Sequence, residues 1–340
     1  MKDDVILELS DIKMYFSPHL NLSQAFSGGK KRKQIKAVDG VSLKLYRGEI
    51  FGLIGESGSG KTTLGKIVMK LYTQTDGKVI FNGEDITNCD KKRKELYRRQ
   101  VQMIFQDPYA SMNPRFKIRD VLEEPLIIHR IKGNRKEHDE KIIKALKEVK
   151  LNPPEEFMGR YPHMLSGGQR QRIATARTLI LNPEIVVADE PVSMIDLSTR
   201  AEILHMMKDV QRELGLTYLY ITHDLSTARY FTDRIAVMYL GRIMEMGKAD
   251  DVIDNPQHPY TRALINAVPE PKDGMLDVIK ELPISGEIPS PANVPKGCRF
   301  HTRCPYAESS CKEEEEPKLV DIGGGHFHAC RFAEKIKQQH

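Results

Sequence analysis

Short apolar runs, each followed by polar residues, alternate with longer helical patterns along this chain. The runs predict buried strands at 49–54, 101–105, 185–190 and 217–224. Residues 116–149 instead have a helical period, with Ile142, Ala145, Leu146 and Val149 on one stripe, and Pro153 follows shortly after. Strands that alternate with helices predict an α/β domain whose sheet is largely parallel.

Three further strands are expected at 5–9, 37–49 and 77–83, the last with Gly83 in a hairpin turn. Residues 17–36 form a linker-like insertion with a basic cluster at 30–33. We interpret this insertion as a solvated loop, with contact to anionic lipid headgroups as the alternative. A second basic run, 91–99, indicates an exposed helix face.

A glycine-rich segment joins the strand at 49–54 to a helical run that begins near Thr63. Its sequence fits the phosphate-loop pattern at every defined position: Gly55, Glu56, Ser57, Gly58, Ser59, Gly60, Lys61 and Thr62. Glycines let successive backbone N–H groups point at an anion, and the helix N-terminus adds its dipole. We predict that residues 55–63 bind a nucleoside triphosphate, with Lys61 on the β- and γ-phosphates and the Thr62 hydroxyl on Mg²⁺.

Polar residues follow three of the predicted strands, at the sheet edge where ligands bind in such folds. Asp189 and Glu190 follow one strand, His223 another and Gln106 a third. Each alone has an ordinary structural explanation, as a helix cap or a satisfied polar residue. Together with the phosphate loop they predict phosphoryl transfer: Asp189 holds hydrated Mg²⁺, Glu190 orients or deprotonates water, His223 contacts the γ-phosphate, and Gln106 senses metal and water.

Composition narrows the class of protein. The net charge of +5, from 52 basic and 47 acidic residues, is too small to indicate nucleic-acid binding. No apolar run approaches the roughly 20 residues needed to cross a bilayer, and the first residues lack the pattern of a signal peptide. Five cysteines, four of them late in the chain, argue against a disulfide framework and for a reducing, ATP-containing compartment.

A second glycine-containing segment, Leu165, Ser166, Gly167, Gly168 and Gln169, runs directly into a helical stretch. Ser166 stands where an N-cap is expected. With the phosphate loop, Gln106, the pair Asp189 and Glu190, and His223, this segment resembles the nucleotide-binding subunits of ATP-binding-cassette (ABC) transporters over residues 5–250.

The resemblance implies a P-loop ATPase with a RecA-like parallel core, an antiparallel β subdomain and a helical subdomain at about 107–172. It also implies that residues 165–169 complete the ATP site of a second subunit, that Asp196 belongs to the loop at that contact, and that Tyr15 stacks on adenine, with Phe16 as the alternative. Met194 and Ile195 depart from the usual Ala-Leu of the family.

Residues 105–115 and 255–264 are similar to stretches of oligopeptide and dipeptide importer ATPases. This narrower resemblance implies an ATPase at the cytoplasmic face of the cell membrane that powers peptide uptake. Its implied partners are transmembrane permease subunits, an identical or paralogous ATPase subunit and, indirectly, an external peptide-binding protein. Nickel or another small solute is the alternative cargo. A soluble ABC protein acting on nucleic acid or ribosomes is disfavoured, because this chain has neither two cassettes nor a long coiled-coil insertion.

Residues 251–340 are expected to form a small irregular extension that carries Cys298, Cys304, Cys311 and Cys330. Four thiolates suit an iron–sulfur cluster, and relatives with a similar tail carry [4Fe–4S]; zinc is the alternative. Arg299, Arg303 and Arg331 would offset the negative charge of a cluster. Because this site and the ATP site come from separate segments, loss of a cysteine is expected to leave ATP binding intact. Cys89 is interpreted as structural.

Overall fold

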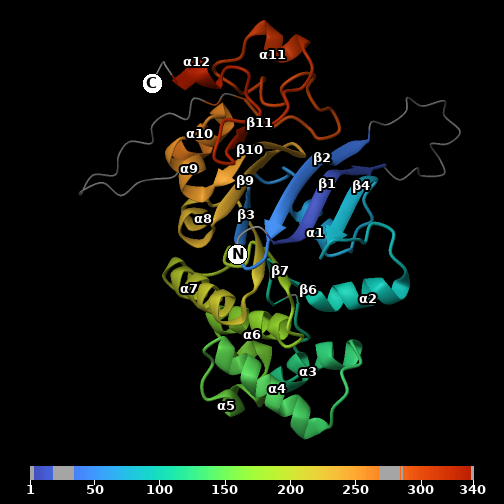
Figure 1. The fold of residues 1–340 in the computed structure, drawn as a ribbon. Coiled ribbons are helices and arrows are strands. Elements are labelled where there is room, and N and C mark those ends of the chain that lie inside the picture. Colours follow the sequence, from blue (N-terminus) through green and yellow to red (C-terminus); the bar gives the residue numbers. More distant parts are fainter. Residues whose placement is uncertain (1–3, 18–33, 110, 268–283, 285, 338–340) are drawn as a thin grey trace, which may run out of the picture.

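The computed structural model describes residues 4–17, 34–109, 111–267, 284 and 286–337 (Figure 1). Its main sheet has the strand order β11-β12-β10-β9-β3-β8-β7-β6. The strands are β3 (Ile50–Ile54), β6 (Val101–Ile104), β7 (Ile185–Asp189), β8 (Thr217–Thr222), β9 (Arg234–Tyr239), β10 (Arg242–Lys248), β11 (Val320–Asp321) and β12 (Phe327–His328). The strands from β9 to β6 are parallel, which confirms the predicted core, and β10, β12 and β11 pair antiparallel.

An antiparallel sheet of order β2-β1-β4-β5 lies beside this core, as expected. Its strands are β1 (Val5–Phe16), β2 (Ile35–Tyr46), β4 (Asp76–Phe81) and β5 (Glu84–Asp85), with Gly83 in the turn between the last two. Most of the predicted insertion, residues 18–33, lies outside the described residues. Ile35 and Lys36 belong to β2 instead, because they pair with Phe16 and Tyr15.

Helices cover the main sheet and form an arm at one end of the molecule. Beside the sheet are α1 (Lys61–Val68), α2 (Lys91–Gln100), α7 (Leu197–Leu214), α8 (Leu225–Phe231) and α9 (Ala249–Asp254). The arm, at the bottom of Figure 1, contains α3 (Ile118–Ile128), α4 (Arg135–Glu148), α5 (Pro154–Met158), the 3₁₀ turn η2 (Pro162–Met164) and α6 (Gly167–Leu179). A new N-cap at Asn134, paired with Glu137, divides the predicted helical stretch into α3 and α4.

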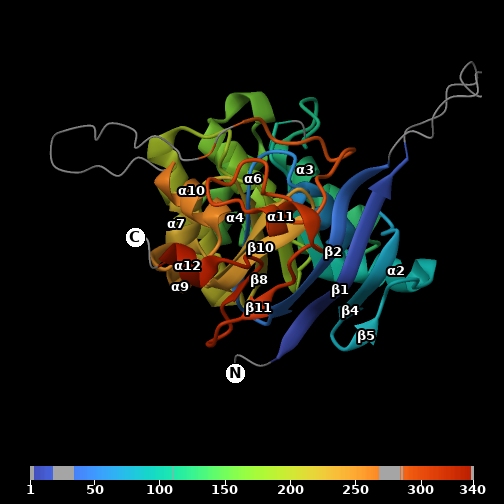
Figure 2. The same ribbon diagram turned by 90° about the horizontal axis from the view of Figure 1, so that it is seen from above.

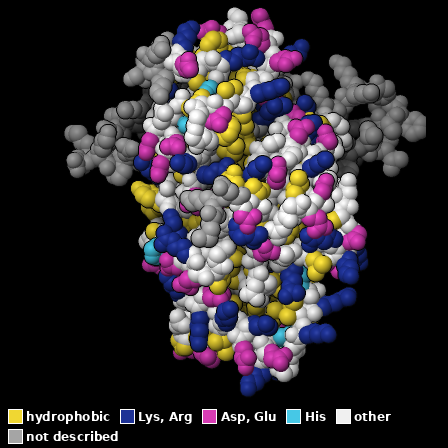
Figure 3. All heavy atoms as spheres, viewed as in Figure 1, with side chains coloured by type: hydrophobic (Ala, Val, Ile, Leu, Met, Phe, Trp, Pro, Cys, Tyr) yellow, Lys and Arg dark blue, Asp and Glu magenta, His cyan; other side chains and the backbone are white. Residues whose placement is uncertain are grey.

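The surface seen in Figure 3 carries basic and acidic side chains interspersed with apolar ones. Of the helices in the described ranges, none combines the length and the apolar character that a membrane crossing requires.

The C-terminal extension packs on the far side of the ATPase core from the helical arm (Figures 1 and 2). It contains α10 (Pro259–Asn266), α11 (Ser309–Glu313), α12 (Ala333–Lys337), β11 and β12. It is less irregular than expected, because β12 pairs with β10 and thereby extends the main sheet. The predicted boundary between residues 250 and 251 falls inside α9. Buried Tyr239, Tyr260 and Phe300 form an aromatic cluster between core and extension.

A buried carboxylate, Glu245 on β10, also joins the extension to the core. Its side chain has no exposed surface and accepts hydrogen bonds from the backbone N–H groups of Gln257 (2.7 Å) and His258 (2.9 Å). His326 Nε2 lies 2.8 Å from the same carboxylate. A buried carboxylate is tolerated only when donors satisfy its oxygens, so this residue fixes α10 and the strand end at His326 to β10.

We expect Glu245→Ala to destabilise the protein, because each buried donor left unsatisfied costs about 1–3 kcal/mol. The midpoint of thermal unfolding should fall by roughly 5 °C or more. Circular dichroism measures it, with Glu140→Ala, at an exposed position of α4, as the matched control. Equal melting midpoints for the two variants would contradict this role of Glu245.

Candidate functional site

The phosphate loop lies between β3 and α1 and packs too tightly for a side chain at Gly55 or Gly60. Gly55, Gly58 and Gly60 have φ values of 155°, 81° and 106°, which favour glycine. A Cβ atom at Gly55 would lie 2.2 Å from the Met238 carbonyl oxygen, and one at Gly60 would lie 2.2 Å from that of Ala37. The glycines therefore let the loop fold back against its neighbours, as the pattern predicts.

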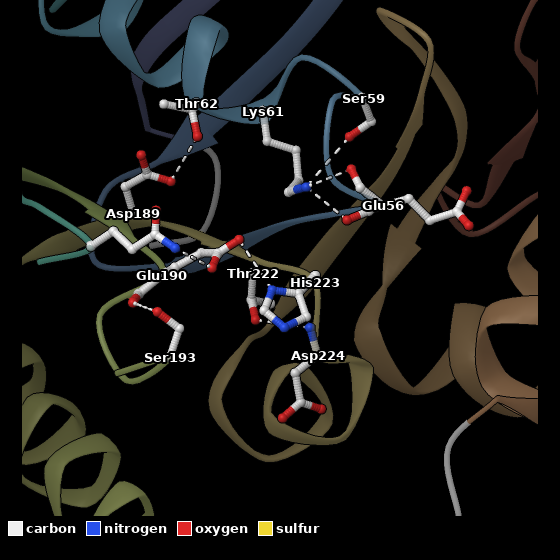
Figure 4. Close-up of polar contacts among 12 residues, drawn as sticks. Glu56, Ser59, Lys61, Thr62, Asp189, Glu190, Ser193, Thr222, His223 and Asp224 are labelled. Carbon is white, nitrogen blue, oxygen red and sulfur yellow. Dashed lines mark hydrogen bonds and ion pairs between the residues drawn. The ribbon is translucent and has the colours of Figure 1, made fainter. Parts of the chain in front are cut away.

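Lys61 is buried inside this loop (Figure 4). Its ammonium group donates to the carbonyl oxygens of Gly55 (2.7 Å) and Glu56 (3.0 Å) and lies 3.4 Å from Ser59 Oγ. Burial lowers the pKa of Lys61, and the nearby carboxylates of Glu190, Asp189 and Glu56 oppose that shift. The lysine is thus a poorly solvated cation positioned in a loop of backbone groups, an arrangement suited to an anionic ligand.

Thr62 and Asp189 meet across the site. Thr62 Oγ1 donates to Asp189 Oδ1 at 3.1 Å, and Asp189 ends the fully buried strand β7. Burial raises the pKa of Asp189, while the Thr62 hydrogen bond lowers it. A hydroxyl and a carboxylate side by side are oxygen donors of the kind that Mg²⁺ prefers. The structure therefore brings together two of the three residues predicted to bind Mg²⁺.

Glu190 brings together residues from the ends of three neighbouring strands. Gln106 Nε2 donates to Glu190 Oε2 at 3.0 Å, and His223 Nδ1 lies 3.1 Å from Glu190 Oε1 (Figure 4). Ser193 Oγ donates to the Glu190 carbonyl oxygen at 3.0 Å. The Glu190 backbone has a positive φ of 48°, which is uncommon outside glycine. Its side chain is thus held from both sides, next to the Asp189 and Thr62 pair.

Tyr15 lies at the end of β1, and Lys36 Nζ sits 5.5 Å from its ring centroid. Its hydroxyl donates to Asp39. Burial, together with this hydrogen bond and the Asp39 charge, raises the pKa of Tyr15 to about 12. Phe16 instead packs its ring edge-on to Tyr72, with centroids 5.6 Å apart. The sequence did not single out Asp39, because nothing local marks it as a partner of Tyr15.

The segment 165–169 begins α6, and the predicted N-cap is confirmed. Ser166 Oγ accepts from the Gln169 N–H at 3.2 Å, and Gln169 Oε1 accepts from the Ser166 N–H at 3.1 Å. A Cβ atom at Gly168 would lie 2.6 Å from Thr199 Cγ2, so this glycine allows α6 to approach α7. Ser166 and Asp196 are both exposed, on the surface rather than in the cluster around Glu190.

The four late cysteines come together around one small cavity of about 20 Å³. All four are free thiols. Burial raises the pKa of Cys298 to about 12 and that of Cys304 to about 11, and neighbouring cysteines add to both shifts. Nowhere in the described ranges do three or more His, Cys, Asp or Glu side chains stand in an arrangement that holds a metal ion.

All three arginines expected to offset a cluster have carboxylate partners, Arg331 with Glu314 among them. Arg303 forms two hydrogen bonds with Glu56 of the phosphate loop, at 2.7 and 3.0 Å. Arg299 pairs with Asp39 and Glu316. The segment that carries the cysteines therefore contacts the phosphate loop, and the expectation that ATP binding survives loss of a cysteine stays a prediction. Sequence reasoning missed these contacts because 247 residues separate Arg303 from Glu56.

Two models of known protein families match parts of this chain. Residues 38–193 match the model of the ABC transporter family, and residues 244–311 match that of the oligopeptide/dipeptide transporter C-terminal region. The oligopeptide transport ATP-binding protein AppF of Bacillus subtilis is 47% identical over 330 residues, covering 97% of this chain and 98% of the relative. The chain belongs to the oligopeptide/dipeptide family of ABC transporter ATP-binding subunits.

Other members and structures agree with this assignment. The dipeptide transport ATP-binding protein DppF of Haemophilus influenzae is 47% identical over 300 residues, covering 88% of this chain and 90% of the relative. A similar solved structure is the ATP-binding cassette MJ0796, a dimer in a post-hydrolysis state bound to ADP and Pi. Its TM-score is 0.61 at 29% sequence identity, and the match covers 72% of this chain and 98% of the MJ0796 chain. The predicted ABC fold is confirmed, and the subunit is an ATPase.

We expect Lys61→Ala to weaken ATP binding by roughly tenfold or more, because it removes a charge-assisted phosphate contact. Glu190→Gln and His223→Ala should leave the ATP dissociation constant nearly unchanged and lower kcat instead. Fluorescence titration and steady-state ATPase assays measure the two effects, and Lys44→Ala, on the exposed face of β2, serves as the control. The role assignments would be refuted by equal losses of ATP affinity in all three variants.

Proposed function

We propose that this chain is the ATP-hydrolysing subunit that powers import of di- or oligopeptides through an ABC transporter. One observation carries the proposal: its similarity to peptide-transport ATP-binding proteins extends over nearly the whole chain, including the C-terminal region at 244–311. Nickel or another small solute is the alternative cargo.

The geometry suggests a role for each residue. The loop from Gly55 to Thr63 and Lys61 bind the triphosphate, while Thr62, Asp189 and Gln106 hold Mg²⁺, which when bound neutralises charge on the phosphates. Glu190 orients water and accepts its proton. Gln106 and His223 each hydrogen-bond one oxygen of that carboxylate, so they fix its direction. His223 would also reach the γ-phosphate, and Tyr15 would stack on adenine.

The second half of the ATP site is proposed to come from another ATPase subunit, identical or paralogous. Ser166 is exposed at the N-terminus of α6, where backbone N–H groups and the helix dipole favour an anion. Exposed Asp196 lies in the loop before α7. The similar cassette structure with ADP and Pi is a dimer, which supports this assembly.

We further propose that the subunit works at the cytoplasmic face of the cell membrane with transmembrane permease subunits and, through them, an external peptide-binding protein. A cavity of about 210 Å³ between β6, α3 and α6 is lined by Phe105, Ser111 and Ile128. Phe105 and Ile128 are 45% and 64% exposed, unusual for large apolar side chains. Phe105 directly precedes Gln106, so a permease helix seated in this cavity would contact the segment whose Gln106 side chain donates to Glu190.

Ile128→Asp should abolish peptide uptake while the ATPase activity of the isolated subunit persists, because it puts a charge in this cavity and not in the ATP site. Uptake of a labelled dipeptide into vesicles containing the complete transporter measures this. Ile288→Asp, at an exposed isoleucine of the extension, is the matched control. Normal uptake by the Ile128 variant would contradict the proposal that a permease helix binds in this cavity. A wild-type transporter that takes up no peptide would contradict the proposal that peptides are its cargo.

For the extension, we propose that residues 251–340 form a unit attached to the ATPase domain at 1–250, with the division at α9. We also propose that this unit holds a [4Fe–4S] cluster, with zinc as the alternative. The ligands would be Cys298, Cys304, Cys311 and Cys330. The small cavity that all four thiols line supports the donor set. The described side chains are not arranged for a metal as they stand, so they would have to converge. A cluster would tie together segments that have little apolar content.

Protein purified without oxygen should then be brown, with about four irons and four sulfides per chain. Each of the four Cys→Ala variants should lose the iron, whereas Cys89→Ala should keep it. Elemental analysis that finds stoichiometric zinc without iron would establish the zinc site instead. Finding neither metal would leave four reduced thiols and end the cluster proposal.

A further inference from the structure

Two arginines of the C-terminal extension, Arg299 and Arg303, reach into the surroundings of the ATP site. Both lie in the segment between Cys298 and Cys304, and both are buried. Their carboxylate partners, Asp39 and Glu56, belong to the ATPase core.

Glu56 places a negative charge within the phosphate loop. Its backbone carbonyl accepts from Lys61, so it lies within the loop that would bind phosphates, yet its side chain carries a negative charge. A free carboxylate there would repel the ligand and compete for Lys61. In the structure the Glu56 carboxylate points away from Lys61 (Figure 4), and the Arg303 guanidinium binds both of its oxygens. Tyr260 of α10 fixes the same residue by accepting from the Glu56 N–H at 2.9 Å.

Arg303 is itself well positioned for this contact. Its side chain is only 9% exposed, while that of Glu56 is 27% exposed. Its guanidinium also lies over the ring of Tyr239, 5.8 Å from the centroid. A planar guanidinium binds a carboxylate with two parallel hydrogen bonds, which a lysine does not reproduce. The pair therefore sets both the charge and the direction of the Glu56 side chain.

Arg299 acts on the other side of the site, through Asp39. The Asp39 carboxylate accepts from Arg299 and from the Tyr15 hydroxyl, and Lys36 Nζ lies 3.3 Å away. Burial alone would raise the pKa of Asp39, but the hydrogen bonds from Tyr15 and Arg299 and the nearby cationic charges lower it to about 2. The chain of contacts thus holds the Tyr15 ring in one orientation.

Arg299 also contacts the phosphate loop indirectly, through the turn between β9 and β10. It donates to the carbonyl oxygen of Leu240, in the turn between β9 and β10. The next residue, Gly241, donates its N–H to the Ser59 carbonyl oxygen at 2.8 Å. The extension therefore contacts the loop through Glu56 and, by way of this turn, through Ser59.

We propose that Arg299 and Arg303 are positioning residues for ATP: Arg303 neutralises Glu56 and turns it away from the phosphates, and Arg299 fixes Tyr15 through Asp39. The proposal rests on the proposed ATP site and assigns the extension a direct part in nucleotide binding by its own subunit. The two arginines predict different losses of affinity, because Arg303 acts where the phosphates would bind and Arg299 acts where the base would bind.

The experiment measures dissociation constants of the full-length chain for ATP and for inorganic tripolyphosphate, which lacks the base. Arg303→Ala should weaken both ligands by roughly tenfold, as when a hydrogen-bonded charge pair is broken. In a Glu56→Gln background, where no carboxylate is left to repel the phosphates, the same substitution should have little effect. Arg299→Ala and Tyr15→Phe should both weaken ATP more than tripolyphosphate, because each breaks the contacts that orient the Tyr15 ring.

Controls separate positioning from folding. Arg331→Ala removes another arginine–glutamate pair of the extension, with Glu314, and should leave both constants unchanged. Arg303→Lys should keep the charge and recover only part of the affinity, and the melting midpoint of each variant is measured alongside. The proposal would be overturned if Arg303→Ala left both affinities unchanged, or if it weakened them equally in the Glu56→Gln background. An equal loss of affinity for both ligands in Tyr15→Phe would also overturn it. A wild-type chain that binds neither ligand would instead refute the ATP site itself.

Discussion

The burial of one positive charge shapes much of this structure. Lys61 is nearly inaccessible to water, and within the described part of the chain its ammonium group contacts two carbonyl oxygens and one hydroxyl. A buried cation is costly unless anions compensate it. Asp189 and Glu190 at the strand ends supply part of that compensation, and bound phosphates would supply the rest. The same need explains why the loop is built of glycines, which bring many backbone groups close to one point.

Charge balance extends outward from this lysine through a set of paired side chains. Glu190 contacts Gln106 and His223, and Glu56 contacts Arg303. Asp39 contacts Tyr15 and Arg299. In each case a carboxylate near the site is held by donors from a different element. The site is therefore a balanced arrangement of charges, to which core and C-terminal extension both contribute.

The sequence could predict the features of this site that depend on neighbouring residues. The phosphate loop, the strand ends at Asp189 and His223, and the N-cap at Ser166 follow from spacing and period, and the structure has each of them. The contacts of Arg299 and Arg303 could not be predicted, because ion pairs between distant segments leave no local pattern. The pairing of β12 with β10 was missed for the same reason: a two-residue strand has no periodicity to recognise. The carboxylate partners of the arginines near the cysteines also lie far away in sequence, in the case of Asp39 and Glu56, so composition does not reveal them.

The short strand β12 has a consequence for solubility. It pairs with the outer edge of β10, whose buried side chains include Ile243, Met244 and Met246. An uncovered strand of this kind offers unpaired backbone N–H and C=O groups to any other strand that meets it. By docking β12 and pinning His326 to Glu245, the extension protects the sheet from edge-to-edge aggregation. The extension, which the sequence alone predicts to be irregular, thus shields the edge strand β10 of the ATPase sheet.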